Sequence, residues 1–507
     1  MGKIRTIITQ DAEVDDQNSL RHFLFYANEV DVQGIIQTSS KFHWKGVPGA
    51  VKAEKKVKDD FDAGEYVENS GPFDQPYRWP GTDWMMRVID DYEKDYPNLC
   101  KHAEGYPTPD YLRRITKVGN IGYEGEMEKP SEGSDLIKER ILDDDERTLF
   151  IQVWGGTNTI ARALMDIEEE YKNKDEWSVL HEKISKKVVI TACGEQDPAY
   201  KEYVAEVWPG IQFVKTLQMM SYAYPWFTMP EGESKDTLKA EFMQKELLSK
   251  DSALIKGYCT WFDGHHYEGE NSEGQFGSNP NILNEWFGAK FLKGEINKYD
   301  FLSEGDSPTF FVLLPFGTRT LEDFTYGGIG GRYMKVDYKN SKGVSCNVFD
   351  VAKDAYTDRD GNITEQESMW GYVADIQRDF AARVSWAAED SYEKAEHSPL
   401  LKICEGCDIS AAAGEHVTIS AIAENPDKLG IDYSFRVYKE ASAECANEIK
   451  PSNECISKEV LDNKAVTTEI VIPDTAVSGD KIHIIAKAAS KGYYKLFDYK
   501  QIIITVK

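Results

Sequence analysis

The sequence has few cysteines, fewer basic than acidic residues, and no long apolar runs. Its eight cysteines in 507 residues are too sparse for a disulfide-stabilised scaffold. The 59 lysine and arginine residues against 87 aspartate and glutamate residues give a formal net charge of −28. That charge disfavours binding to nucleic acid or anionic lipid, because both require clustered positive side chains. No run of about 18 apolar residues occurs, so we expect no membrane span.

Several common catalytic signatures are missing as well. No segment resembles a phosphate-binding loop, a G-x-S-x-G nucleophile elbow or a cysteine nucleophile with its partners. What the chain does contain is enough apolar material for a sizeable core: 41% of its residues are hydrophobic and 12% are aromatic, which argues against disorder. We therefore expect an acidic globular protein with a large domain and a smaller partner.

The first 400 residues alternate short apolar runs with amphipathic stretches. Ile4 to Thr9 is typical of a buried strand, Asp16 to Asn28 of a helix, and Val30 to Ser40 of a second strand. The alternation recurs at residues 148–156, 158–171 and 186–193, and further apolar runs follow at 254–262 and 308–316, the last expected as a late strand. Strands that are apolar on both faces predict an α/β fold with a mostly parallel sheet and helices on both sides.

The pattern changes after His397. Runs of alternating polarity separated by turn residues then follow at 416–423, 433–440, 465–473, 481–489 and 499–507. About a hundred residues of this kind predict an immunoglobulin-like β-sandwich. We therefore expect an α/β domain at 1–400 and a sandwich at 401–507. In the second domain, disulfides or free thiols are favoured over a zinc site for Cys404, Cys407, Cys445 and Cys455.

The turn after the first strand, TIITQDAEVDDQNSL, is crowded with carboxylates. Asp11 follows the strand, Glu13 lies in the turn, and Asp15 and Asp16 open the helix. Two like charges about 4 Å apart repel by roughly 4 kcal/mol at an effective dielectric constant near 20. A helix N-terminus offsets only about 0.3–1 kcal/mol per charge. The residues alone leave two explanations open: a hard cation such as Ca²⁺ or Mg²⁺, or a solvated acidic N-cap.

A family resemblance bears on that choice. The run DAEVDDQNSLRHFLFYANEVDVQGIIQTSS resembles the nucleoside hydrolase superfamily, and more closely a bacterial nucleoside-hydrolase-like family. Members of that family are often described as cellulose-binding and carry an appended immunoglobulin-like domain. Further matching motifs are WGGTNTIARAL, EGDSP and GGIGGRY. The resemblance covers nearly the whole chain and implies a nucleoside-hydrolase-like fold for residues 1–400.

The resemblance also implies a metal site. It implies Ca²⁺, with Mg²⁺ less expected, bound by Asp11, Asp15, Asp16, Asp306 and a main-chain carbonyl of Thr157 or Asn158. Asp11 would also act as the general base on a metal-bound water. Four carboxylates from distant parts of the chain are what a hard cation requires.

The sequence departs from the superfamily pattern at several positions. Thr9 stands where an aspartate is usual, and Ala12-Glu13 replace Pro-Gly. Lys41 is the nearest counterpart of a sugar-binding asparagine, and Gly305 replaces the histidine that commonly protonates the leaving group. The metal-binding residues are thus kept while the sugar and base contacts differ, which makes ribonucleosides doubtful substrates.

Other residues are candidates for proton donation and for substrate binding. The candidate acids are Glu304 and the pair His265-His266, although adjacent histidines are often ordinary loop residues. Candidate substrate-binding residues are Glu13, Ser40, Lys41, Trp44, Glu195, Gln196, Asp197, Trp226 and Arg332. For each tryptophan the alternative is packing in the core. For Arg332 the alternative is an ion pair with a carboxylate of the protein itself.

Together these observations predict a calcium-dependent glycoside hydrolase acting on a carbohydrate or glycoconjugate. Attack by water predicts inversion at the anomeric carbon. The alternatives are a non-catalytic protein that binds a cellulose-like polysaccharide, and a nucleoside N-ribohydrolase. We expect a secreted or periplasmic bacterial protein. The sequence begins MGKIRTIIT with no charged-then-apolar leader, and removal of a signal peptide stays open. The oligomeric state stays open, with a homo-oligomer among the options.

Overall fold

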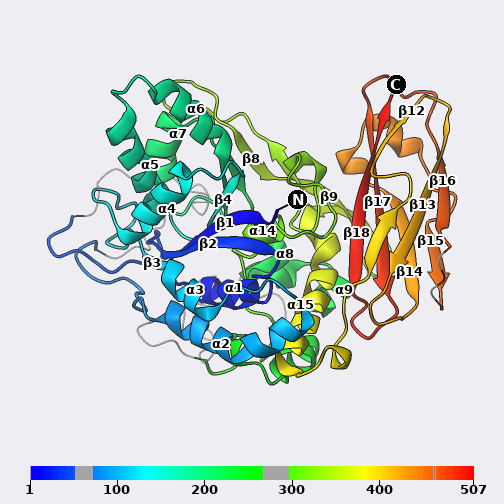
Figure 1. Cartoon of the computed structure of the whole chain (residues 1–507), viewed down its shortest axis with the longest axis horizontal. Helices are drawn as coiled ribbons and strands as arrows, with labels where there is room; N and C mark the ends of the chain where they lie inside the picture. Colours follow the sequence, from blue (N-terminus) through cyan, green and yellow to red (C-terminus); the bar gives the residue numbers. More distant parts are fainter. Residues whose placement is uncertain (1, 52–71, 266–295, 461, 463) are drawn as a thin grey trace.

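The chain folds into an α/β body and a β-sandwich that lies against one side of it (Figure 1). The computed structural model describes residues 2–51, 72–265, 296–460, 462 and 464–507. Within these residues no helix has both the length and the apolar character needed to cross a bilayer. The predicted fold class, a mostly parallel α/β sheet with helices on both faces plus an immunoglobulin-like sandwich, is confirmed.

The body is built on an eight-stranded sheet in the order β3-β2-β1-β4-β5-β6-β8-β7. Neighbouring strands pair parallel except β7 and β8, which pair antiparallel at one edge. The strands are β1 (Ile4–Gln10), β2 (Val30–Gln37), β3 (Thr116–Val118), β4 (Leu149–Val153), β5 (Val188–Ala192), β6 (Gln212–Lys215), β7 (Tyr333–Lys335) and β8 (Val348–Val351). The strand order reverses between β1 and β4, and ligands of open α/β sheets bind beyond the carboxyl ends of strands at such a point.

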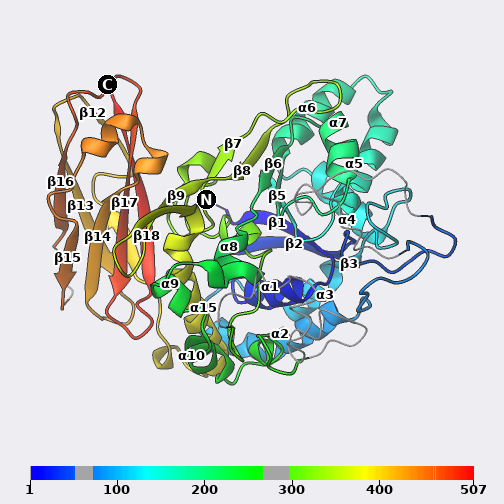
Figure 2. The same ribbon diagram turned by 180° about the vertical axis from the view of Figure 1, so that it is seen from behind.

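Helices cover both faces of this sheet (Figures 1 and 2). One face carries α1 (Val14–Leu24), α2 (Trp84–His102), α3 (Pro109–Ile115) and α15 (Val373–Ala388), and the other carries α4 (Glu132–Leu142), α5 (Asn158–Tyr171) and α6 (Trp177–Lys187). Successive residues of β1 point to opposite faces of the sheet. Ile8 packs in the apolar cluster that includes α1 and α15, and Ile7 packs in the cluster that includes α4 and α5. The strands are therefore apolar on both sides, as the sequence predicted.

The apolar runs near residues 254 and 308 are helical at their starts, and the predicted late strand at 308–316 is wrong. Shorter helices of the body are α7 (Ala205–Val207), α8 (Met219–Tyr222), α9 (Glu233–Asp236), α10 (Ala240–Phe242), α11 (Ala253–Lys256) and α14 (Pro308–Phe311). Pro308 stands at the start of α14, where a missing N–H is tolerated. The apolarity of this run reflects burial of Phe310 and Phe311 in the core rather than strand formation.

The C-terminal part consists of a three-stranded and a five-stranded sheet, in the orders β11-β13-β16 and β12-β18-β17-β14-β15. Its strands are β11 (Leu400–Ile403), β12 (Asp408–Ala411), β13 (His416–Glu424), β14 (Ile431–Val437), β15 (Cys455–Lys458), β16 (Val466–Val471), β17 (Lys481–Ser490) and β18 (Phe497–Val506). All eight cysteines of the chain are outside disulfides. The boundary between residues 400 and 401 stays a prediction.

The sandwich is joined to the body by a shared core and by buried polar contacts. A hairpin of β9 (Lys353–Thr357) and β10 (Ile363–Glu367) precedes α15 on the side that faces the sandwich. Asp375 of α15 contacts Nζ of Lys487 at 2.7 and 2.6 Å and accepts a hydrogen bond from the hydroxyl of Tyr499. Phe497 and Tyr499 belong to the same apolar cluster as the helices of the body. The two parts are therefore packed together rather than tethered.

Candidate metal and substrate site

Four buried aspartates meet at the carboxyl end of the sheet. Asp11 follows β1, Asp15 and Asp16 lie in the first turn of α1, and Asp306 precedes α14. One carboxylate oxygen each of Asp15, Asp16 and Asp306 lies within 4.8 Å of the others, and the same holds for Asp11, Glu13 and Asp16. The structure thus brings together the four aspartates that the sequence singled out, although Asp306 is nearly 300 residues from the others.

Each of these aspartates keeps one oxygen without a hydrogen bond. The main-chain N–H of Asp11 donates to Oδ1 of Asp16 at 3.0 Å, and the hydroxyl of Ser303 donates to Oδ2 of Asp15 at 3.1 Å. Among the described residues, the remaining oxygens have no partner: Oδ2 of Asp11, Oδ1 of Asp15, Oδ2 of Asp16 and Oδ2 of Asp306. Buried polar atoms are nearly always satisfied in native proteins, so this convergence calls for a ligand.

The pKa values of the four aspartates are raised. Burial raises the pKa of Asp15 to about 6, and the charge of Asp11 adds to that effect. Burial also raises the pKa of Asp11, against hydrogen bonds from Ser40 and others that lower it. For Asp16 and Asp306, burial followed by the charges of the neighbouring aspartates holds the pKa well above its usual range. The cluster is therefore costly to ionise without a compensating positive charge.

The donor set fits a hard divalent cation. Every group in the cluster offers oxygen, and carboxylate oxygens are the ligands that Ca²⁺ and Mg²⁺ prefer. A cation would supply the charge that the four buried side chains lack. The solvated acidic N-cap, the alternative that the sequence left open, is contradicted, because Asp15 and Asp16 are 6% and 0% exposed.

The turn between β4 and α5 closes the site beside Asp11. A Cβ on Gly155 would lie 2.6 Å from Cβ of Asp11, so only glycine fits there. Thr157 and Asn158 follow at the start of α5, and the carbonyl of Thr157 accepts a hydrogen bond from Ala161 N–H at 2.9 Å. The side-chain amide of Asn158 donates to main-chain carbonyls of Asn120 and Glu126. That a carbonyl of Thr157 or Asn158 binds the metal stays a prediction.

Asp197 and Gln196 hold the adjoining loops together. Asp197 accepts hydrogen bonds from the main-chain N–H groups of Asn158 and Ala199, both at 3.0 Å, and burial raises its pKa to about 7. The side-chain amide of Gln196 donates to the carbonyl of Trp154. Glu195 is fully buried with Nζ of Lys215 at 2.9 Å. Asp197 and Gln196 therefore contact the turn after β4 that adjoins Asp11. That these residues and Glu195 bind substrate stays a prediction.

The loop after β2 brings a second group of polar residues to the site. The hydroxyl of Ser40 hydrogen-bonds to Asp11, and the main-chain N–H of Lys41 donates to the carbonyl of Gln196 at 2.8 Å. Oε1 of Glu13 lies 3.5 Å from Nη2 of Arg78 and 3.8 Å from Nδ1 of His43. Ser40 and Glu13 therefore lie next to Asp11, and Lys41 is tied to the loop of Gln196. That these three residues bind substrate stays a prediction.

Two residues of this group were not singled out from the sequence. Arg78 is buried and lowers the pKa of Asp11, and burial together with Arg78 holds the pKa of His43 well below its usual range. His43 shares a loop with Lys41, which is a weak signal. Nothing in the sequence spacing connects residue 78 with the turn at 11–16, so only the structure reveals Arg78.

Glu304, a predicted acid, is directed into the core along α1. Its carboxylate contacts Nδ1 of His22 at 2.7 Å and accepts hydrogen bonds from the hydroxyls of Tyr258 and Ser307. The ring of His22 stacks in turn on Phe380 with centroids 3.7 Å apart. With three partners and no exposed surface, Glu304 is engaged in holding α1 to the segment before α14. Its role as a proton donor stays a prediction that these contacts do not favour.

The histidine pair is only partly described. Nδ1 of His265 lies 2.8 Å from Oδ2 of Asp263, and this contact raises the pKa of His265. His266 lies outside the described residues. Among the described residues, His265 groups with Cys259 and Asp263 and not with the four aspartates.

Trp44 and Trp226, two of the candidate substrate-binding residues, are buried and offer no exposed ring face to a sugar. Trp44 is 0% exposed and packs against Phe73 and Tyr77. Trp226 is 2% exposed, and its Nε1 donates to the carbonyl of Phe301 at 2.7 Å. Both rings have the packing role that was their alternative, because loops rich in aromatics fold onto their own side chains.

Arg332, predicted to bind substrate, has a structural role. Its Nε donates to Oδ1 of Asp354 at 2.8 Å, and its Nη2 donates to the carbonyl of Lys353 at 2.8 Å. Asp354 is bound in turn by the hydroxyl of Tyr438 from the sandwich. The guanidinium thus takes part in the contact between body and sandwich, which is the structural role that the sequence left open for it.

The fold and the site together define the class of this protein. The body has a mostly parallel sheet with an aspartate cluster between the end of β1 and the start of α1, and a β-sandwich follows it. This is a nucleoside-hydrolase-like architecture with an appended domain. The chain belongs to the family described as "Cellulose-binding Sde182, nucleoside hydrolase-like domain", whose model matches residues 5–333. The family model "Cellulose-binding protein Sde0182, C-terminal domain" matches residues 416–506. The resemblance inferred from the sequence is thereby confirmed.

Solved structures agree with this fold. A nucleoside hydrolase-related hypothetical protein from Saccharophagus degradans, associated with carbohydrate metabolism, is 24% identical, with 100% of both chains covered and a TM-score of 0.67. The fibronectin(III)-like modules of Clostridium thermocellum CbhA are 18% identical over 21% of this chain and 97% of theirs, with a TM-score of only 0.14. No protein of curated function matches the sequence. The likeness to the Saccharophagus degradans protein shows the fold of this chain.

Proposed function

We propose that this protein is a Ca²⁺-dependent glycoside hydrolase that acts on a carbohydrate or glycoconjugate. The observation that carries the proposal is the convergence of four buried aspartates, each with one oxygen that has no hydrogen bond among the described residues. Such a cluster lies where the strand order reverses, which is the usual ligand position of an open α/β sheet. Membership of a family described as cellulose-binding supports a carbohydrate as the ligand.

The four aspartates would hold the cation, and Asp11 would act on the attacking water. When bound, a divalent cation lowers the pKa of a coordinated water and orients sugar hydroxyls. Asp11 is suited to accept the proton, because its Oδ2 has no hydrogen-bond donor among the described residues. Ser40 and Glu13, which contact Asp11 through their hydroxyl and main-chain N–H, would fix the carboxylate for that transfer. Attack by water in a single displacement inverts the anomeric centre.

A binding-only role is the second candidate, and the surroundings of residues 304–306 favour it. Gly305 stands where the superfamily has a leaving-group acid, and a Cβ there would lie 3.2 Å from Oδ2 of Asp15. The neighbouring carboxylate of Glu304 is occupied by three core contacts. A protein that keeps the cation but lacks an acid would bind sugar hydroxyls without cleaving the glycosidic bond.

One set of measurements separates these functions. The chelator-treated protein is titrated with Ca²⁺ by calorimetry, and release of reducing sugar from cello-oligosaccharides and a glycoside panel is followed with Ca²⁺ and with chelator. Asp11→Asn is compared with Asp110→Asn, which changes an exposed aspartate in the first turn of α3. Hydrolysis that requires Ca²⁺ and is lost only in Asp11→Asn supports the proposal.

The other outcomes are equally informative. Undiminished hydrolysis by Asp11→Asn would overturn the assignment of the base. Ca²⁺-dependent binding to polysaccharide with no product would favour the binding-only role, and free base from inosine or uridine would favour a nucleoside hydrolase. We further propose a location outside the cytoplasm, because cellulose-like polymers are met there. Detection of the native protein in the cytoplasmic fraction alone would contradict that location.

A further inference from the structure

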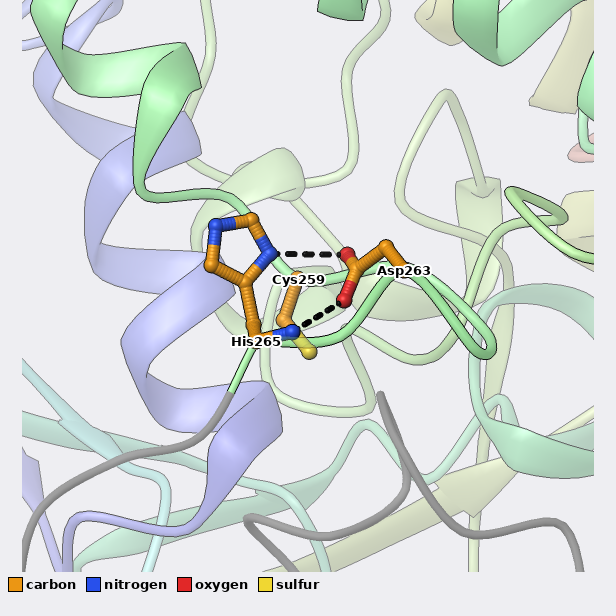
Figure 3. Close-up of side chains that lie close together, drawn as sticks. All are labelled: Cys259, Asp263 and His265. Carbon is orange, nitrogen blue, oxygen red and sulfur yellow. Dashed lines mark hydrogen bonds and ion pairs between the residues drawn. The ribbon is translucent and has the colours of Figure 1, made fainter.

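A second cluster of metal-ligating side chains lies apart from the four aspartates. Cys259, Asp263 and His265 offer a thiol, a carboxylate and an imidazole, and one ligand atom of each lies within 4.8 Å of the others (Figure 3). All three belong to the loop that follows α11. This donor set differs in kind from the all-oxygen cluster, because it contains sulfur and nitrogen.

The imidazole is held in the orientation that metal-ligating histidines use. Nε2 of His265 lies 3.2 Å from the carbonyl of Lys256, while Nδ1 faces Oδ2 of Asp263 at 2.8 Å. Histidine ligands usually donate their other ring N–H to a backbone carbonyl or carboxylate, which fixes the tautomer. With the proton on Nε2, the lone pair of Nδ1 is directed at the cluster.

The carboxylate is fixed as well. Oδ2 of Asp263 accepts hydrogen bonds from the main-chain N–H and hydroxyl of Thr260, at 2.6 and 2.9 Å. Its Oδ1 accepts from the main-chain N–H of His265 at 2.8 Å. Ligating carboxylates are commonly held by such outer contacts. The two side chains therefore need little rearrangement to receive an ion between them.

The loop is anchored to α1 on one side and open to solvent on the other. The side-chain amide of Asn18 donates to the carbonyl of Cys259 at 2.9 Å, and the main-chain N–H of Cys259 donates to Oδ1 of Asn18 at 2.8 Å. Cys259 is buried, whereas the side chain of His265 is 39% exposed. An ion can thus enter from the side of His265, and solvent can supply the fourth ligand that three-ligand zinc sites leave open.

We propose that Cys259, Asp263 and His265 bind a borderline divalent transition-metal ion, Zn²⁺ being the best fit. Sγ, one carboxylate oxygen and Nδ1 are the three ligands, and thiolate with imidazole selects this class of ion over Ca²⁺. The ion takes the place of the proton shared by His265 and Asp263 and braces the loop against α1. His265 then serves as a ligand and is not the leaving-group acid.

The test uses Co²⁺ as a spectroscopic substitute for Zn²⁺. The full-length protein is stripped with chelator, saturated with Ca²⁺ to fill the aspartate site, and titrated with Co²⁺. We expect a thiolate-to-cobalt charge-transfer band in the near ultraviolet that saturates at a single Co²⁺ per chain and disappears when Zn²⁺ is added. Co²⁺ at the aspartates gives no such band, because that site contains only oxygen.

Variants assign the band to the cluster. Cys259→Ser should abolish it, and His265→Ala should weaken Zn²⁺ affinity by about tenfold or more. Cys346→Ser is the matched control, because Cys346 is a buried thiol whose sulfur contacts only main-chain carbonyls among its hydrogen-bond partners in the described chain. Asp306→Asn, which alters the aspartate site, should keep the band.

Two results would overturn the proposal. The first is a wild-type protein that shows no thiolate band at stoichiometric Co²⁺, a measurement that does not depend on any variant folding. The second is a band that survives in both Cys259→Ser and His265→Ala, because sulfur from another part of the chain would then be the ligand.

Discussion

At the scale of single residues, the absence of a side chain at position 155 decides how closely the turn after β4 approaches the aspartate cluster. A Cβ there would lie 2.6 Å from Cβ and 2.9 Å from Cγ of Asp11. Gly155→Ala should therefore displace the Asp11 carboxylate at a cost of about 1–3 kcal/mol, as overpacking of a tight interior does. We expect Ca²⁺ affinity to fall by about tenfold or more, measured by calorimetry.

Gly371→Ala is the control for this change. An added Cβ at Gly371 meets nothing within 4 Å, so affinity and stability should stay close to those of the unaltered protein. Equal Ca²⁺ affinity in the two variants would show that Gly155 is not held against Asp11.

The raised pKa values of the aspartates predict how metal-free stability changes with pH. Asp15 has a pKa of about 6 in the fold against 3.8 in an unfolded chain, so the folded protein binds more protons between these values. The free energy of unfolding therefore falls as pH rises from about 4 through about 6, by about 3 kcal/mol for Asp15 alone. Asp16 and Asp306 act in the same direction at higher pH.

Thermal melts in chelator and in Ca²⁺ at a series of pH values measure this effect. We expect Tm in chelator to fall between pH 5 and pH 8, and the stabilisation by Ca²⁺ to grow over the same range. Asp15→Asn should flatten the chelator curve, because an amide does not titrate. A chelator Tm that rises with pH to the same extent in both proteins would contradict the assignment.

At the scale of secondary-structure elements, α1 connects the aspartate site with the loop after α11. Asn18 lies one turn beyond Asp15 and bonds the main chain of Cys259 and the carbonyl of Ser303, the latter at 3.3 Å. Asn18→Ala leaves these buried groups unpaired, which should destabilise the fold by about 1–3 kcal/mol. Because Ser303 leads into Asp306, Ca²⁺ affinity should fall as well.

Urea denaturation and Ca²⁺ titration of Asn18→Ala test this connection. Asn98→Ala is the comparison, since Asn98 of α2 donates to the carbonyl of Ala387 and accepts from Nζ of Lys101, both far along the chain from the aspartates. It should lose stability without losing Ca²⁺ affinity. Loss of affinity to the same degree in both variants would mean that general destabilisation, and not the position of α1, is responsible.

The strands and the acidic turn could be predicted from the sequence because their signals are local. Buried parallel strands such as β1 are continuous apolar runs, and crowded carboxylates at Asp11, Asp15 and Asp16 have few explanations. Asp306 was found only through the family resemblance, because no local pattern connects it with the first turn. The direction of Glu304 and the burial of Trp44 depend on tertiary packing, which sequence neighbours do not specify. The helix at Pro308 was missed because a short apolar run fits either structure.

At the scale of the whole molecule, the contact between body and sandwich contains a partly buried ion pair. Asp375, 7% exposed, is held by Lys487 and Tyr499 of the sandwich. Asp375→Ala leaves the Lys487 charge and the Tyr499 hydroxyl without this partner, so we expect a loss of about 3 kcal/mol. Asp390→Ala removes a solvent-exposed pair with Lys394 and should cost much less stability, because solvent screens such pairs.

Calorimetric unfolding reads out both variants. The unaltered chain should unfold in one transition, because its two parts share a core, whereas Asp375→Ala should broaden or split it. Two separate transitions in the unaltered chain, unchanged in Asp375→Ala, would show that the parts unfold independently.

The shared apolar cluster limits how this protein can be dissected. Tyr438, Phe497 and Tyr499 of the sandwich lie in the same cluster as Phe380 and Trp386 of α15. Cutting the chain near residue 400 would expose those α15 side chains and leave an apolar surface on the α/β body. The sandwich is therefore needed to cover the apolar surface of α15. A truncated α/β fragment should precipitate during purification, whereas the two parts expressed together should form a soluble complex.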